Sequence, residues 1–388
     1  MIGGLSGRAG RFPVGASVDL ASLDADAHAV LARLRATEPV SWVPAWDCWL
    51  VTGHAQAVEV MRDSAAFTVD DPRFSTARVV GSSMLSLDGA EHARHRAPFV
   101  APFRPARVQR RFGADVARLA GDLVGRFTGG RAELRRELAG PLSVAVVAEV
   151  LGLGDTDAAT VLSWYAAIVD AVSGDRPGAP VPEAARAAMA SLTEHVHAGL
   201  AAERPGSLLA GAAHTLTEEQ VVANAAVMMF GGIETTEGMI LNAVRHTLEA
   251  GLADRAGAPD GAAALVEESL RMEPAAAVVD RYATADVRLG EAEVATGDLV
   301  RVSLAGANRD PAVFPDPNVF DPDRANARAQ LAFARGPHVC VAMDLARLET
   351  RVALRTLVTA LPGLRVAEPV AARGLVFRKP PRLTVRWD

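Results

Sequence analysis

The sequence predicts a mainly α-helical protein with small β-sheets, an α+β fold. Apolar residues recur at helical spacing through most of the 388 residues. One helical segment extends from about residue 217 to 250, on the order of 50 Å at a rise of 1.5 Å per residue. Near the N-terminus, two strand-like runs at 40–43 and 48–51 lie between shorter helical runs. The sheets are therefore expected to be minor beside the helices.

The elements follow one another without an internal repeat or a low-complexity linker, so we predict one domain spanning 1–388. Residues 1–20 are expected to be a loose N-terminal segment, and 64–87 an irregular one because its periodicity is weak. The shorter helices are expected at 27–36, 54–62, 90–99, 106–128, 135–152, 156–173 and 183–203, with a connection rich in Gly and Pro at 174–182.

Composition narrows the class of protein. The chain is 50% hydrophobic and 22% charged, as ordinary globular proteins are. Its net charge of −6 argues against a nucleic-acid binder. Two cysteines provide no disulfide framework, and residues 1–14 lack an apolar run that could be a signal peptide or membrane anchor. We therefore expect a soluble, cytoplasmic protein that binds neither nucleic acid nor membrane.

Cys340 ends a loop that contains Gly336 and Pro337, and a helical run follows it. A helix N-terminus offers unpaired N–H groups and the positive end of a dipole, which together favour a thiolate. Such a thiolate can be a nucleophile or a metal ligand. Taken alone, however, a single cysteine is more often a small inert hydrophobic residue.

The centre of the predicted long helix contains residues that lower helix stability. Thr217 and Gln220 form a capping box that can start it. Its middle reads Phe-Gly-Gly-Ile-Glu-Thr-Thr over 230–236, and each glycine inside a helix costs about 1 kcal/mol relative to alanine. Either something must approach the backbone there, or another helix packs against the glycines.

The loop at 333–340 resembles the haem-binding loop of the cytochrome P450 family, Phe-Gly-x-Gly-x-His-x-Cys-x-Gly. Phe333, Gly336, His338 and Cys340 match, whereas Ala334 and Ala342 replace two of the family's glycines. The resemblance implies the P450 fold, with a long central helix over a haem whose iron Cys340 ligates. A thiolate ligand donates electron density that favours O–O cleavage.

The centre of the long helix resembles the family's oxygen-binding motif. The resemblance implies that Gly231 leaves room for dioxygen, and that the Thr235 hydroxyl and the Glu234 carboxylate deliver the protons that O–O cleavage consumes. Thr236 is expected to be structural. Glu268 and Arg271 resemble the family's Glu-x-x-Arg pair, which Arg324 joins, and this group is assigned to structure.

Four cations match the positions at which the family holds haem propionates: His92, Arg96, Arg281 and His338. His92 and Arg96 are four residues apart, so they face the same way on a helix. Each cation taken separately could equally be a solvated surface group. The set of motifs is much more specific than any member of it.

The substrate pocket is expected to be apolar, which suits a lipophilic small molecule. The candidate pocket residues are Met84, Leu85, Val227, Phe230, Ala277, Val278, Val376 and Phe377. Ordinary core packing is an equally good explanation for each of them.

The resemblance implies a haem-thiolate monooxygenase that hydroxylates or epoxidises a lipophilic small molecule, in bacterial secondary metabolism. It implies haem b (Fe protoporphyrin IX), O2, and electrons from NAD(P)H through a ferredoxin reductase and a ferredoxin. A basic cluster could dock that ferredoxin, or could be a solvated helix face: Arg94, Arg104, Arg107, Arg110 and Arg111. We expect a monomer. The alternatives are a P450 that performs C–C or aryl coupling, desaturation or cyclisation, and a non-enzymatic thiolate-haem sensor.

Overall fold

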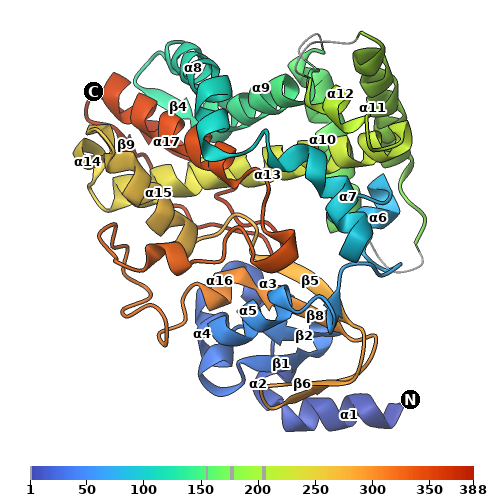
Figure 1. Cartoon of the computed structure of the whole chain (residues 1–388). Helices are drawn as coiled ribbons and strands as arrows, with labels where there is room; N and C mark the ends of the chain where they lie inside the picture. The colour runs from blue at the N-terminus through green and yellow to red at the C-terminus, as the bar shows by residue number, and fades with distance from the viewer. Residues whose placement is uncertain (1, 154–155, 175–178, 203–206) are drawn as a thin grey trace. The chain divides into compact units, whose positions relative to one another are not determined.

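The computed structural model describes residues 2–153, 156–174, 179–202 and 207–388 (Figure 1). Its internal contacts divide the chain into two units, each built from several segments. The first unit comprises 1–69, 263–340 and 370–381, and the second comprises 70–262, 341–369 and 382–388. The expectation of one domain stays a prediction.

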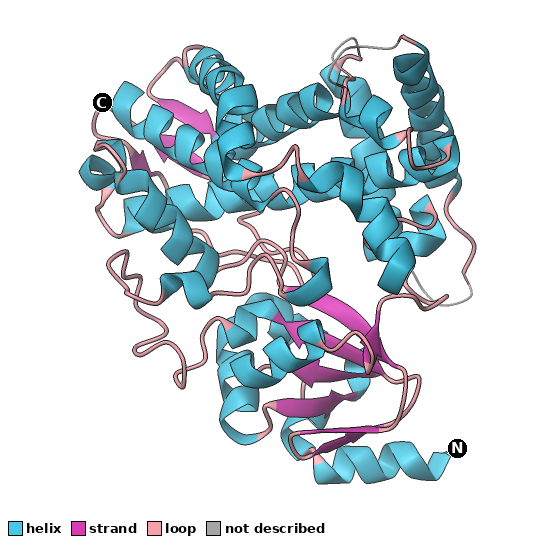
Figure 2. Cartoon of the chain, viewed as in Figure 1, coloured by secondary structure: helices cyan, strands magenta, loops and turns pink. Residues whose placement is uncertain are grey.

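The first unit holds a five-stranded sheet in the order β1-β2-β8-β5-β3, drawn in magenta in Figure 2. Its strands are β1 (Val40–Val43), β2 (Cys48–Val51), β3 (Phe67–Thr68), β5 (Val278–Ala283) and β8 (Leu299–Ser303). β2 pairs with β8 in parallel, and the other pairs are antiparallel. Every residue of β1 and β2 is buried, and all of them except Ser41 are apolar.

Helices and short strands complete the first unit. After residue 26 its helices are α4 (Ala27–Thr37), α5 (His54–Arg62), α15 (Gly261–Met272) and α16 (Leu304–Ala307), with 3₁₀ turns η1 (Pro44–Trp46), η3 (Ala327–Ala329) and η4 (Gly336–His338). β6 (Val287–Leu289) and β7 (Ala292–Val294) form a two-stranded sheet. The expected helices at 27–36 and 54–62 are confirmed.

The prediction of a loose segment at residues 1–20 is wrong. The segment forms α1 (Ile2–Arg11) and α2 (Pro13–Ala16), and α3 (Leu20–Ala25) follows. Arg8 lies over the ring of Trp42 at 4.7 Å and pairs with Asp298 at 2.8 Å. Glycines at positions 3, 4, 7 and 10 lower the intrinsic helix propensity, and contact with the rest of the unit outweighs that cost.

The second unit is mainly helical. Its helices are α6 (Ser75–Val80), α7 (Gly89–Val100), α8 (Pro105–Val124), a π-turn η2 (Arg135–Ala139), α9 (Gly140–Leu151), α10 (Ala158–Ser173), α11 (Glu183–Ala201), α12 (Leu208–Ala212), α13 (Glu218–Glu249), α14 (Ala253–Gly257) and α17 (Met343–Ala360). β4 (Arg131–Glu133), β10 (Thr384–Arg386) and β9 (Arg365–Val366) form a three-stranded sheet. α13 contacts α9, α10, α11 and α17, which makes it the centre of this unit.

The long helix begins as predicted, because Thr217 and Gln220 form both hydrogen bonds of the capping box. The segment 64–87 is less irregular than predicted, since it contains β3 and α6. The end of the expected helix 183–203 and the centre of the connection 174–182 fall at 203 and 175–178, outside the described residues.

Candidate active site

The cysteine loop of the first unit is shaped by its own backbone. The Cys340 N–H donates to the Phe333 carbonyl at 2.9 Å, which closes the loop. Gly336 has φ +74°, and a Cβ atom there would collide with the carbonyl oxygen of Met61, so this position requires glycine. α17 begins at Met343, two residues later than the helical periodicity predicted. Cys340 therefore lies just before a helix N-terminus, as a thiolate ligand should.

The two cysteines differ in environment. Cys48 lies in β2 and is fully buried, and burial raises the pKa of its thiol to about 12. Cys340 is only partly buried. A thiolate ligand must be deprotonated and reachable, so Cys340 fits a haem iron and Cys48 does not.

The two alanines that replace family glycines differ in backbone strain. Ala334 has φ +58°, in the left-handed region that favours glycine. Ala342 has φ −99° and ψ 16°, which an alanine adopts without left-handed strain. The strain in this loop therefore lies at Ala334.

We expect Ala334→Gly to give a more stable protein than Ala342→Gly, by about 1–2 kcal/mol. Both substitutions remove a methyl group from a partly buried position and loosen the unfolded chain. Only the first relieves a left-handed alanine. Denaturant unfolding of the two variants measures the difference, and equal free energies of unfolding would contradict the strain argument.

The two glycines at the centre of α13 serve different purposes. A Cβ atom at Gly232 would lie 2.7 Å from a methyl of Val147 in α9, so Gly232 permits close helix packing. A Cβ atom at Gly231 would meet no atom within 4 Å. The Thr235 hydroxyl donates to the Gly231 carbonyl at 2.5 Å. Helix packing thus explains Gly232 but not Gly231.

Glu234 belongs to a polar cluster that the sequence did not reveal. The Tyr165 hydroxyl, from α10, donates to the Glu234 carboxylate. One turn further along α13, Glu237 accepts from the Arg135 Nε at 2.7 Å. Tyr165 sits within an apolar helical run, so no spacing rule could have linked it to Glu234. The count of two tyrosines in the chain was the only unusual signal.

The expected propionate-binding cations come from three elements. His92 and Arg96 share one face of α7, where His92 is buried and Arg96 is half-buried. Arg281 is a buried residue of β5, and His338 ends η4 half-buried. Charged side chains that are buried or half-buried are usually paired with a group of opposite charge. The burial of these four cations is therefore consistent with binding to carboxylates.

The predicted ion pair between Glu268 and Arg271 is present, and Arg324 joins it. Two Arg271 nitrogens donate to Glu268 at 2.7 and 2.9 Å, and the Arg324 Nε donates to it at 3.2 Å. Arg271 and Glu268 are 0% exposed. Arg271 also donates to the carbonyls of Asn308, Pro317 and Val319.

The candidate pocket residues fall into two groups. In the second unit, Met84, Val227 and Phe230 are buried and Leu85 is partly buried. The side chain of Asn224, one turn before Val227, accepts from the Met84 N–H at 2.9 Å and contacts His95 at 3.1 Å. In the first unit, the Ala277 N–H donates to Val376 at 2.8 Å, Phe377 bridges to Ala276, and Val278 begins β5. Asn224 is a further residue that sequence reasoning missed.

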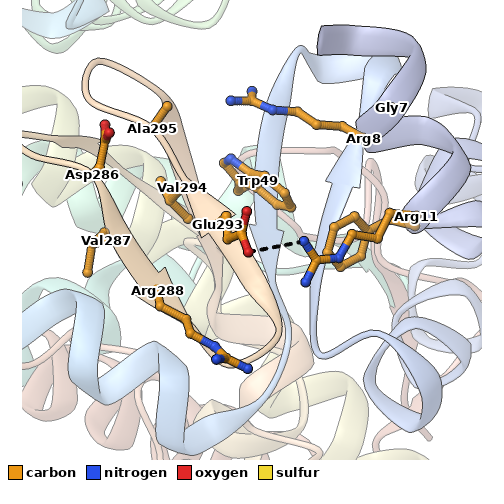
Figure 3. Close-up of a pocket in the computed structure, with 11 residues that line it drawn as sticks. Gly7, Arg8, Arg11, Trp49, Asp286, Val287, Arg288, Glu293, Val294 and Ala295 are labelled. Carbon is orange, nitrogen blue, oxygen red and sulfur yellow. Dashed lines mark ion pairs between the residues drawn. The ribbon is translucent and has the colours of Figure 1, made fainter.

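A surface hollow of about 640 Å³ in the first unit is a poor candidate for an apolar substrate (Figure 3). Its lining includes Arg8 and Arg11 of α1 and Glu293 of β7. Arg11 pairs with Glu293 at 3.4 Å, across the hollow in Figure 3. The lining is thus charged in part rather than apolar throughout, and we assign the hollow no ligand.

Four of the five arginines in the basic cluster are exposed along the start of α8: Arg104, Arg107, Arg110 and Arg111. Arg94 differs, because it pairs with Glu91 at 2.7 Å and donates to Gln220 at the start of α13. No helix among the described residues has the length and apolar character needed to cross a membrane.

Comparisons with known proteins show the family and the fold of this chain. The model of the family Cytochrome P450 matches residues 262–361. Nocardicin C N-oxygenase from Nocardia uniformis subsp. tsuyamanensis is 34% identical over 93% of this chain and 96% of its own. Mycinamicin IV hydroxylase/epoxidase from Micromonospora griseorubida is 31% identical over 92% of this chain and 94% of its own. The crystal structure of P450BioI with an acyl carrier protein that bears hexadec-9Z-enoic acid is 25% identical, with a TM-score of 0.86 over 95% of this chain and all of that one.

The fold and the relatives define the class of protein as a haem-thiolate oxidoreductase. The chain belongs to the cytochrome P450 family. It has the P450 fold and is a monooxygenase of that family, a class that uses a thiolate-ligated haem, O2 and reducing equivalents.

Proposed function

We propose that this P450 uses O2 to hydroxylate or epoxidise a lipophilic small molecule in bacterial secondary metabolism. The observation that carries the proposal is the contrast between the cysteines: Cys340 is accessible before a helix N-terminus, and Cys48 is buried. Names of relatives such as nocardicin C N-oxygenase and mycinamicin IV hydroxylase/epoxidase support oxidation of a complex natural product.

In this proposal, Cys340 is the iron ligand of haem b. Phe333 and Gly336 shape the loop that presents it, since one supplies the closing carbonyl and the other the left-handed turn. The haem propionates would be held by four cations: His92, Arg96, Arg281 and His338. When bound, the haem supplies the oxidising chemistry, and the protein supplies ligation, charge pairing and protons.

Three residues of α13 handle oxygen and protons in the proposal. Gly231 leaves space beside the helix, where a methyl would meet no atom within 4 Å. The Thr235 hydroxyl would hold and donate a proton, and the Glu234 carboxylate would resupply that proton from the solvent side. Candidate pocket residues hold the substrate: Met84, Leu85, Val227, Phe230, Ala277, Val278, Val376 and Phe377.

Electrons come from NAD(P)H through a ferredoxin reductase and a ferredoxin. The exposed arginines at the start of α8 would attract an acidic ferredoxin and speed its encounter with the enzyme. Turnover with NAD(P)H by the purified chain alone would contradict this part of the proposal.

The absorption spectrum of the reduced, CO-bound protein tests the central assignment. We expect a strongly red-shifted Soret band in the wild type and in Cys48→Ser, and its loss in Cys340→Ser. The pair is matched because each variant replaces one of the chain's two cysteines. A red-shifted band that survives in Cys340→Ser, or the absence of haem from the wild type, would reject the proposal.

A further inference from the structure

A buried tyrosine holds the carboxylate of Glu234. Tyr165 projects from α10, which contacts α13, and both Tyr165 and Glu234 are less than 10% exposed. The tyrosine hydroxyl donates to the Glu234 Oε2. Burial, and then the negative charge of Glu234, raise the pKa of Tyr165. The hydroxyl therefore stays protonated and remains a hydrogen-bond donor.

A second pair lies one turn further along α13, and one of its members is solvent-exposed. Arg135, in η2, pairs with Glu237 at 2.7 Å, and its side chain is 39% exposed whereas that of Glu237 is 7% exposed. Burial alone would lower the pKa of Arg135, but the charge of Glu237 and their hydrogen bond raise it, with smaller contributions from Tyr165 and Glu234. The four groups thus form one electrostatic cluster with a solvent-exposed end.

Helix geometry places Glu234 in this cluster rather than beside the Thr235 hydroxyl. Residues three apart share a helix face, so Glu234 and Glu237 both project toward the cluster. Successive residues project about 100° apart, so Thr235 leaves α13 in another direction. A Cβ atom at Gly140 would come within 3.1 Å of the Glu237 carboxylate, so this glycine lets α9 approach the cluster closely.

We propose that Tyr165 is a positioning residue for proton delivery, which holds the Glu234 carboxylate where it takes up a proton from the solvent side of the cluster. Glu234 then releases Tyr165 and gives that proton to Thr235, and it returns as a carboxylate. One proton enters from water and one leaves toward the oxygen, so no other reactant is needed. This inference rests on the proposed function of Glu234 and Thr235.

Four proteins test the idea in turnover: the wild type, Tyr165→Phe, Glu234→Gln and the double variant. Tyr165→Phe should lower the product formed per NAD(P)H about fivefold and raise the solvent deuterium isotope effect. That loss is smaller than the 10²–10⁴-fold contribution of a complete acid–base group, because the carboxylate is still present. The double variant should match Glu234→Gln. As a control, Ser163→Ala removes an exposed hydroxyl from α10. This variant should form as much product per NAD(P)H as the wild type.

A spectroscopic measurement is independent of turnover. The chain has two tyrosines, Tyr165 and Tyr282, so ring-labelled tyrosine gives two ¹³Cζ signals in the diamagnetic, reduced CO-bound protein. Glu234→Gln should shift the Tyr165 signal and leave that of Tyr282 in place. An unmoved Tyr165 signal would show that the two side chains do not interact, which would overturn the inference.

The outcomes separate this inference from the function on which it rests. Wild-type coupling in Tyr165→Phe, beside an uncoupled Glu234→Gln, would reject the role of Tyr165 alone. Effects that multiply in the double variant would also reject it, because Tyr165 would then act by another route. Wild-type coupling in Glu234→Gln would reject the proposed role of Glu234 and this inference with it.

Discussion

Replacing Arg271 with leucine should lower the free energy of unfolding by about 3–5 kcal/mol, the cost of breaking a buried ion pair from one side. Glu268 would keep its carboxylate at 0% exposure with Arg324 and the Asp321 N–H as partners. The carbonyls of Asn308 and Pro317 would also lose the Arg271 donor, while that of Val319 would keep Arg324. Because domains are stable by only about 5–15 kcal/mol, much of this variant should unfold at moderate denaturant concentrations.

An exposed ion pair provides the matched control. Arg118 pairs with Asp115 at 3.3 Å, and both side chains are about half exposed. Arg118→Leu should cost less than about 1 kcal/mol, as exposed pairs do. Denaturant unfolding of both variants measures the contrast. Equal costs would show that the Glu268–Arg271 pair does not support the fold.

Thr235→Ala should uncouple NAD(P)H consumption from product formation, with about a tenfold loss of product per NAD(P)H. The hydroxyl that donates to the Gly231 carbonyl at 2.5 Å would be absent, while the helix would gain a good helix former. Reducing equivalents should still be consumed, with hydrogen peroxide replacing product. Thr235→Ser keeps the hydroxyl and should retain most of the coupling.

Thr236→Ala is the control for this prediction. Thr236 is the adjacent residue and is buried, so its loss should affect stability rather than coupling. The ratio of product to NAD(P)H does not depend on how much protein is folded, which makes the two effects separable. Thr235→Ala with wild-type coupling would remove the role assigned to Thr235.

Local sequence patterns were sufficient to predict the elements that depend on interactions between residues close in sequence. The capping box predicted the start of α13, and Gly336 and Pro337 before a helical run predicted the cysteine loop. Ion pairs between residues at (i, i+3) spacing on a helix, such as Glu268 and Arg271, could also be predicted. In each case the interacting residues lie within a few positions of one another.

Long-range contacts could not be predicted in this way. Tyr165 and Glu234 are 69 positions apart, and Asn224 and Met84 are 140 apart. The helix α1 was missed for the same reason, because Arg8 gains its ion pair from Asp298, 290 positions away. Hydrophobic periodicity depends only on residues that are close in sequence. Contacts between residues that folding brings together from distant positions therefore cannot be predicted from it.

The burial of Cys48 makes thiol labelling a simple way to follow haem incorporation. Its high pKa and lack of exposure protect it from alkylating reagents in the folded protein. Cys340 is then the single thiol that such a reagent can reach, and the iron ligation proposed for Cys340 would block it. The stoichiometry of labelling in a folded preparation would equal the fraction of molecules that have yet to acquire haem.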